Sequence, residues 1–271
     1  MLPIMLQLYN VRDELARNFD AALAQIAEIG YSHVELALAQ AYGKSPEQFK
    51  ASLSAAGLTA VSAHVPFQDL RDRPEEALAF HIEIGCKFIV IPYLAEEDRS
   101  TSPHYEDVKK TIARLGETAR KLGVTLLYHN HDFEFAQYKG KFALDDLYDS
   151  IPPEILQTEI DVCWAKVGGV DPAEYIRKYK NRAPVVHLKD FAASGIGKGT
   201  SSLIGTAENP QPEAFPFRAL GQGIQDFPKI IQAAQEAGTQ WLVVEQDLPS
   251  PGKSPIECAK ESWRFLQNLK I

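Results

Sequence analysis

The chain has 271 residues, of which 45% are hydrophobic and 24% are charged, and its formal net charge is −8. A chain of this size can bury a large core without disulfides. Its acidic balance disfavours binding to a phosphate backbone, so no nucleic-acid partner is expected. No segment approaches the ~20 apolar residues that span a bilayer, so no membrane partner is expected either.

The cysteines and the first residues of the chain predict a cytoplasmic protein. Cys86, Cys163 and Cys258 fit neither a zinc motif nor a disulfide framework. An odd number of scattered thiols suits a reducing compartment. The first ten residues, MLPIMLQLYN, lack the basic region and the apolar stretch of a signal peptide.

Short apolar runs alternate with helical patterns along the whole chain. Each run is nearly continuously apolar, as is typical of parallel strands that are buried on both faces. The predicted strands are IMLQLY (4–9), HVELAL (33–38), LTAVSAH (58–64), KFIVIPY (87–93), VTLLYHN (124–130), ILQTEID (155–161), PVVHLKD (184–190) and WLVVEQ (241–246).

The segments between these runs have helical periodicity, most clearly over 105–123, where apolar residues fall on one stripe and charged residues lie opposite. Several helices are predicted to end at a glycine before the next strand and to begin at a Ser-Pro or Asp-Pro pair. Repeated strand–helix units in a chain of this length predict a (β/α)₈ barrel, a TIM barrel, as a single α/β domain over 1–271. An open doubly wound sheet is the alternative, but QLYNVRDEL after the first strand is no glycine-rich phosphate loop.

One long irregular stretch, 191–223, is rich in Gly, Ser and Pro. Loops of this length in a compact barrel are usually functional. We therefore predict that 191–223 lies over the mouth of the barrel.

Polar side chains gather where the predicted strands end, which is the end of such a barrel that holds the active site. An ionisable group in a barrel interior must be paired, hydrogen-bonded or bound to a metal. Glu134, Asp161, His187 and Glu245 belong to the last four strands, and their coincidence predicts a metal site. Further polar residues at these ends are Gln7, Tyr9, Glu35, His64, Tyr93, His129, Asn130, His131, Glu159, Lys189, Asp190, Gln246 and Asp247.

Each of these residues also has a structural interpretation. A lone histidine at a strand end is more often a hydrogen-bonded structural residue than a ligand. Glu35 and Lys189 could each close an ion pair. His129 and His131 fit a ligand, a supporting residue or a substrate contact equally well.

Several motifs make the chain similar to a known family. They are YHNHDFEF (128–135), EIDVCWAKVGGVDP (159–172), VVHLKD (185–190), LGQGIQDFPKII (220–231) and LVVEQD (242–247). Over nearly its whole length the chain resembles the xylose isomerase-like TIM barrels, which are often called sugar phosphate isomerases/epimerases.

The resemblance implies one divalent metal ion, held by a Glu, an Asp, a His and a second Glu from strands five to eight. The last three match Asp161, His187 and Glu245. Many members carry the first Glu where this chain has His129, so Glu134 is the candidate replacement. The alternatives are His129, His131 or a site with three protein ligands. Three carboxylates and one imidazole favour Mn²⁺ or Mg²⁺, with Mn²⁺ as our first choice and Co²⁺, Fe²⁺ and Zn²⁺ admissible.

The resemblance also implies a sugar isomerase or epimerase, in which a base removes the proton next to a carbonyl group and a metal-stabilised enediolate forms. Glu134 and Glu245 would share the acid and base roles. HNHD after strand five also resembles members that are lyases or dehydratases. Such an enzyme would act on a keto-sugar, a keto-inositol or a 3-keto-glycoside.

The expected partner is a small-molecule sugar or sugar derivative, which need not be phosphorylated because no glycine-rich phosphate cradle is present. A homo-oligomer is compatible with the resemblance. Two remote alternatives are a non-catalytic sugar-binding barrel and an abasic-site endonuclease, and the acidic charge disfavours the latter. The residues expected to contact substrate are His64, Tyr93, His129, His131, Lys189 and Arg218.

Overall fold

The computed structural model describes residues 2–198 and 215–269. Its parallel strands close into a barrel in the order β1-β12-β9-β8-β5-β4-β3-β2, with each strand hydrogen-bonded to its neighbours. This architecture confirms the predicted TIM barrel. The barrel strands are β1 (Ile4–Gln7), β2 (His33–Leu36), β3 (Thr59–His64), β4 (Phe88–Ile91), β5 (Thr125–His129), β8 (Leu156–Asp161), β9 (Val185–Leu188) and β12 (Trp241–Val244).

Most of these strands end one or two residues earlier than the sequence predicted. β1, for example, ends at Gln7, and the next residues, Leu8–Val11, form the 3₁₀ turn η1. The side chain of Gln7 accepts the backbone N–H of Tyr9, so the polar residue itself closes the turn. The polar ends of the predicted strands therefore lie on the loops that form the mouth.

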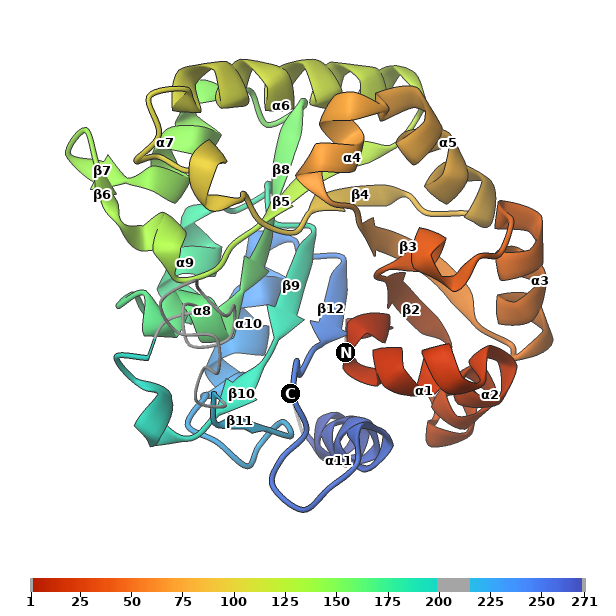
Figure 1. Ribbon diagram of the computed structural model, residues 1–271. Coiled ribbons are helices and arrows are strands. Elements are labelled where there is room, and N and C mark those ends of the chain that lie inside the picture. The colour runs from red at the N-terminus through yellow and green to blue at the C-terminus, as the bar shows by residue number, and fades with distance from the viewer. Residues whose placement is uncertain (1, 199–214, 270–271) are drawn as a thin grey trace.

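Helices surround the strands on all sides (Figure 1). The predicted Ser-Pro starts are confirmed, since Ser45 and Ser254 each form a capping box with the residue three positions later. The helices are α1 (Arg12–Arg17), α2 (Phe19–Ile29), α3 (Pro46–Ala55), α4 (Phe67–Asp72), α5 (Pro74–Ile84), α6 (Tyr105–Lys121), α7 (Ala143–Ser150), α8 (Val162–Val167), α9 (Pro172–Lys178), α10 (Phe227–Ala237) and α11 (Pro255–Asn268).

The loops carry further short elements. β6 (Gln137–Tyr138) and β7 (Lys141–Phe142) pair antiparallel in a small hairpin. The remaining 3₁₀ turns are η2 (Ala39–Tyr42), η3 (Glu96–Asp98), η4 (Phe133–Phe135) and η5 (Ala193–Gly195). No helix in the described part of the chain has the length and apolarity needed to cross a membrane.

The barrel interior is apolar toward the amino-terminal ends of the strands and polar toward their carboxyl-terminal ends. A plug of buried side chains fills the lower part: Met5, Val61, Phe88, Val90, Leu127, Val185 and Val243. Side chains two positions apart in a strand point the same way. Leu127 is therefore followed on the inner face by His129, Val185 by His187 and Val243 by Glu245. On each of these strands, the inward-facing residue that comes two positions after the apolar plug is therefore a polar residue of the mouth.

The predicted loop 191–223 is partly regular, because β10 (Asp190–Phe191) pairs antiparallel with β11 (Phe217–Arg218). Residues 199–214 of that loop lie outside the described residues, and its position over the mouth stays a prediction. The carboxylate of Asp190 holds the returning chain by accepting the backbone N–H groups of Gly221 (3.0 Å), Gly223 (2.8 Å) and Gln225 (3.2 Å). A Cβ on Gly223 would lie 2.2 Å from Oδ1 of Asp190, so only glycine fits there.

The Asp190 anchor generates a stability prediction. Asp190→Asn replaces one acceptor oxygen with an NH₂ group that faces backbone donors, so the free energy of unfolding should fall by about 2–3 kcal/mol. Denaturant unfolding measures this change. Asp226→Asn is the matched control, because within the described residues the Asp226 side chain accepts only the N–H of Lys229, at the start of α10. Asn caps helices equally well, so the control should change stability by less than about 0.5 kcal/mol. Equal losses in the two variants would contradict the anchoring role.

Candidate active site

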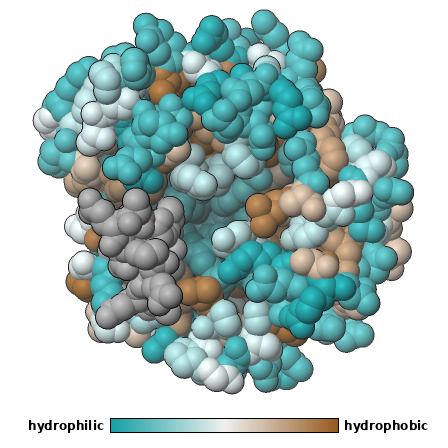
Figure 2. Space-filling model, in the orientation of Figure 1, coloured by the Kyte–Doolittle hydropathy of each residue, from teal (hydrophilic) through white to brown (hydrophobic). Residues whose placement is uncertain are grey.

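A cleft of about 400 Å³ opens at the carboxyl-terminal ends of the barrel strands. Figure 2 shows a central hollow with a largely hydrophilic floor and hydrophobic atoms along part of its edge. The position agrees with the active-site end of such barrels. Among the residues predicted for the site, those that line the cleft are His64, Tyr93, His129, His131, Lys189 and Glu245.

Four side chains meet at the floor of this cleft. His129 ends β5, Asp161 ends β8, His187 lies in β9 and Glu245 directly follows β12. Each offers a ligand atom, and these atoms all lie within 4.8 Å of one another. All four side chains are buried. Three of the four predicted metal ligands are thus brought together, and His129 completes the group.

The orientation of His129 leaves one ring nitrogen without a partner. Its Nδ1 lies 3.2 Å from the carbonyl oxygen of Pro92, which can only accept, so Nδ1 carries the proton. Burial lowers the pKa of His129, and the ring is therefore neutral. Its Nε2 lone pair faces Oδ2 of Asp161 at 3.5 Å and Oε2 of Glu245 at 3.8 Å, with no hydrogen bond. A lone pair that faces two carboxylates fits a bound cation.

Asp161 is held so that one oxygen points into the group. Its Oδ1 accepts the backbone N–H groups of Cys163 (2.7 Å) and Trp164 (2.9 Å) at the start of α8. Its Oδ2 is buried without a hydrogen-bond partner. The Asn130 side chain fixes the Asp161 backbone, accepting its N–H at 3.0 Å and donating to its carbonyl at 3.3 Å. Sequence reasoning gave Asn130 no role.

His187 is clamped by carboxylates on both sides. Its Nδ1 lies 2.8 Å from Oε2 of Glu245. Its Nε2 lies 2.7 Å from Oε2 of Glu35 and 3.1 Å from Oε2 of Glu159. Burial opposes a charged ring, but Glu159, Glu35 and Glu245 together raise the pKa of His187 above its ordinary value. Nδ1 faces Glu245, another member of the group, so Nδ1 is the nitrogen placed to face an ion, while Glu35 and Glu159 hold Nε2 as carboxylates typically hold the second nitrogen of a metal-binding histidine.

Glu35 and Glu159 form a second level beneath the floor. Glu35 accepts hydrogen bonds from Nε2 of Gln7 (2.7 Å) and from the hydroxyl of Ser62. Glu159 lies 2.6 Å from Nε2 of His64. A second group, made of His64, His129, Glu159 and His187, therefore also places its ligand atoms within 4.8 Å of one another. Both oxygens of Glu35 are engaged, whereas Glu159 contacts His64 and His187 through Oε2 and its buried Oε1 has no hydrogen-bond partner among the described residues. Because both carboxylates contact His187, we assign them a supporting role.

Lys189 lies at the cleft side of the group. Its Nζ is 2.9 Å from Oε2 of Glu245, 3.1 Å from Oδ2 of Asp247 and 3.3 Å from Oδ2 of Asp161. Burial alone would lower the pKa of Lys189, but these carboxylates raise it well above its usual value. The ammonium group therefore stays charged, and it lines the cleft beside the carboxylates that hold it.

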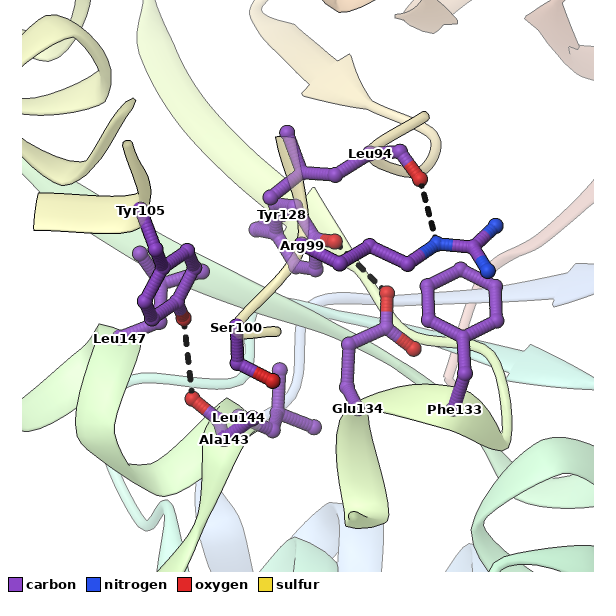
Figure 3. A pocket seen from close by; sticks show the side chains of 10 residues that line it. All are labelled: Leu94, Arg99, Ser100, Tyr105, Tyr128, Phe133, Glu134, Ala143, Leu144 and Leu147. Atoms are coloured by element: carbon purple, nitrogen blue, oxygen red, sulfur yellow. Dashed lines mark hydrogen bonds between the residues drawn. The ribbon is translucent and has the colours of Figure 1, made fainter. Parts of the chain in front are cut away.

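Glu134 does not lie in this group, which corrects its expected position. Successive residues of a strand point to opposite faces, so Tyr128 points away from the side of β5 that carries His129. Glu134 lies on that outer side (Figure 3), where its Oε1 accepts from the Tyr128 hydroxyl at 2.6 Å. Its Oε2 accepts the backbone N–H of His131 at 2.7 Å. Burial raises the pKa of Glu134 to about 7.

The remaining predicted contacts fall into two groups. His64, Tyr93, His131 and Lys189 line the cleft as expected. Arg218 is not among the lining residues, and its Nη1 donates to the carbonyl of Phe217 at 2.8 Å. Sequence reasoning missed Arg12, whose Nη1 donates to the carbonyls of Tyr9 (2.8 Å) and Asp247 (2.9 Å) at the cleft wall.

Comparison with known proteins agrees with this geometry. Curated relatives include an inosose dehydratase of Geobacillus kaustophilus, 23% identical over 92% of this chain and 87% of its own length. Another, from Lacticaseibacillus casei, is 25% identical over 92% of this chain and 88% of its own. A solved sugar phosphate isomerase/epimerase from Parabacteroides distasonis is 24% identical, with a TM-score of 0.79 over 100% of this chain and 95% of that one. A family model described as xylose isomerase-like TIM barrel matches residues 23–269. The chain therefore belongs to the xylose isomerase-like TIM barrel family.

Proposed function

We propose that the protein is a metal-dependent enzyme that removes a proton next to the carbonyl group of a sugar or a cyclic polyol ketone. We further propose that it completes the reaction as a dehydratase or lyase, by eliminating a hydroxyl or glycosyl group from the neighbouring carbon. The observation that carries the proposal is the buried group of His129, Asp161, His187 and Glu245 at the floor of the cleft.

We infer that these four side chains are the metal ligands, with His129 in the place expected for Glu134. Two imidazoles and two carboxylates favour Mn²⁺, Fe²⁺, Co²⁺ or Zn²⁺ over Mg²⁺, which prefers oxygen ligands. Mn²⁺ remains our first choice. When bound, the ion would polarise the carbonyl group and stabilise the negative charge that forms as the adjacent proton leaves.

The position of Glu134 disfavours the isomerase mechanism in which Glu134 and Glu245 share the acid and base roles. An isomerase with two glutamates needs both carboxylates at the substrate, but Glu134 lies behind Tyr128 on the outer face of β5. Glu245 lines the cleft and is placed to accept the proton. The cleft is also lined by the His64 imidazole and by the Asp247 carboxyl group, whose pKa burial raises to about 6, and either group can protonate a departing oxygen. A carboxylate base together with a group that can donate a proton suits the loss of a leaving group. The curated relatives that are named inosose dehydratases support the same reaction class.

The ligand assignment predicts the metal content of variants. Protein purified without chelator should hold about one divalent ion per chain. His129→Ala, Asp161→Asn and Glu245→Gln should each lower the affinity at least ~10-fold, because each removes a donor from the group. Glu134→Gln should keep the ion, since its carboxylate lies outside the group. Elemental analysis by mass spectrometry measures the content. Loss of the ion in Glu134→Gln, together with its retention in His129→Ala, would show that the strand-five ligand is misassigned.

The reaction class is tested by NMR in D₂O with an inosose and with unmodified ketoses as candidate substrates. We expect deuterium uptake next to the carbonyl group, release of water and a new unsaturated ketone that absorbs in the ultraviolet. Glu245→Gln should slow the exchange by roughly 10²–10⁴-fold, because it removes the proposed base.

Other outcomes of this experiment distinguish the alternatives. Deuterium uptake with every hydroxyl group retained would indicate an isomerase or epimerase. Binding without any exchange would contradict an enzymatic role and favour a sugar-binding barrel.

A further inference from the structure

One side of the cleft is walled by apolar side chains. Leu38, Pro66, Pro92 and Tyr93, here called the apolar rim, all line it. They follow β2, β3 and β4, which are consecutive in the barrel. The proposed metal ligands come from β5, β8, β9 and β12, the other part of the ring. The cleft thus has a polar side and an apolar side.

Leu38 has an unusual backbone for an exposed leucine. Its φ of 54° and ψ of 25° are left-handed, a conformation that disfavours residues with a Cβ and is usually taken by Gly or Asn. Its side chain is 46% exposed, so burial within the protein does not offset the strain. Backbone strain without a packing gain tends to occur at functional sites.

Tyr93, another residue of the apolar rim, is also exposed. It is 43% exposed, and its ring meets His131 edge to face with centroids 6.0 Å apart. Large exposed hydrophobic residues are few in the described part of the chain: besides Leu38 and Tyr93 they are Leu122 and Ile196, neither of which lines the cleft. Two of these four residues thus lie together at this mouth, and exposed apolar side chains that lie together are typical of a binding site.

The apolar rim offers few hydrogen-bond donors or acceptors to a second polar group of a ligand. Leu38, Pro66 and Pro92 have no side-chain donor or acceptor. Nη1 of Arg12, at the adjoining wall, donates to two backbone carbonyls, and the guanidinium lies over the Tyr9 ring at 4.1 Å. The volume of about 400 Å³ is within the range of sites that enclose a ligand of two joined rings.

We propose that the apolar rim is a subsite for an aromatic substituent that is joined to the sugar-like part of the substrate. The proposal rests on the proposed function only for the position of the sugar-like part, beside the metal ligands. The substituent would lie against Tyr93 and Leu38, where an aromatic ring removes apolar surface from water and can pack against the tyrosine ring.

The test compares two matched probes, phenyl β-D-glucopyranoside and methyl β-D-glucopyranoside, by calorimetry or ligand-observed NMR with the metal-loaded protein. We expect the phenyl probe to bind roughly 10-fold tighter, the ratio that burying part of one ring supports. In Leu38→Asn and Tyr93→Ser this ratio should fall to within about 2-fold. Asn tolerates a left-handed backbone, so Leu38→Asn should keep or raise the melting temperature while it loses the phenyl preference.

Leu122→Asn is the matched control, because Leu122 is 48% exposed but lies at the end of α6 outside the cleft. It should keep the full preference for the phenyl probe. Equal binding of the two probes by the wild-type protein, or no binding of the phenyl probe, overturns the proposal. A methyl β-cellobioside that binds as tightly as the phenyl probe also overturns it, because the subsite would then hold a second sugar.

The experiments distinguish a failure of the subsite proposal from a failure of the proposed function. Measuring both probes with and without chelator, beside deuterium exchange on the ketones, separates them. A phenyl preference without metal binding or exchange would refute the proposed function and leave the subsite intact. Metal binding and exchange without a phenyl preference would refute only the subsite.

Discussion

The excess of buried negative charge at the mouth of the barrel is the constraint on which the site depends. Glu35, Glu159, Asp161 and Glu245 are all buried within one network, and Lys189 is the only lysine or arginine that the described contacts bring into it. Burying a carboxylate is strongly unfavourable unless it is paired or bound to a cation. A protonated His64 offsets part of this charge, and His187 does so only while no ion is bound, because an imidazole that binds a metal is neutral. A divalent ion would offset the rest.

Much of the surrounding structure orients these oxygens. The start of α8 and the Asn130 amide hold Asp161, and Gln7 and Ser62 hold Glu35. On the opposite side of the ring Asn10 plays the part of Asn130, since it donates to the carbonyl of Val244 and accepts the N–H of Gln246. Such fixed partners keep each donor in place before a ligand arrives, which is what a preorganised site needs.

The sequence predicts the barrel well because the signals of the fold are local. The apolar runs, the helix caps and the period of two within each strand all depend on neighbouring residues, and from them the sequence predicts that Asp161, His187 and Glu245 lie together, as they do in the structure. Glu134 was misplaced because it lies five residues beyond the strand, where the η4 turn decides its direction and no periodicity applies. The roles of Asn130 and Asn10 depend on contacts 31 and 236 residues apart in the chain, which one sequence does not reveal.

The polar and apolar sides of the mouth have different roles in the binding that we propose. In the enzyme that we propose, the floor between β5 and β12 would bind by charge and fix where the chemistry occurs, whereas the rim after β2, β3 and β4 would bind by shape and apolar contact. Leu38 and Pro66 make no described ion pair or hydrogen bond with the donors at the floor. Changes at sites without shared partners are usually additive. The rim is therefore free to vary the selected substrate without disturbing the buried charges, and this separation is a physical reason why one barrel can serve different substrates with the same donor group.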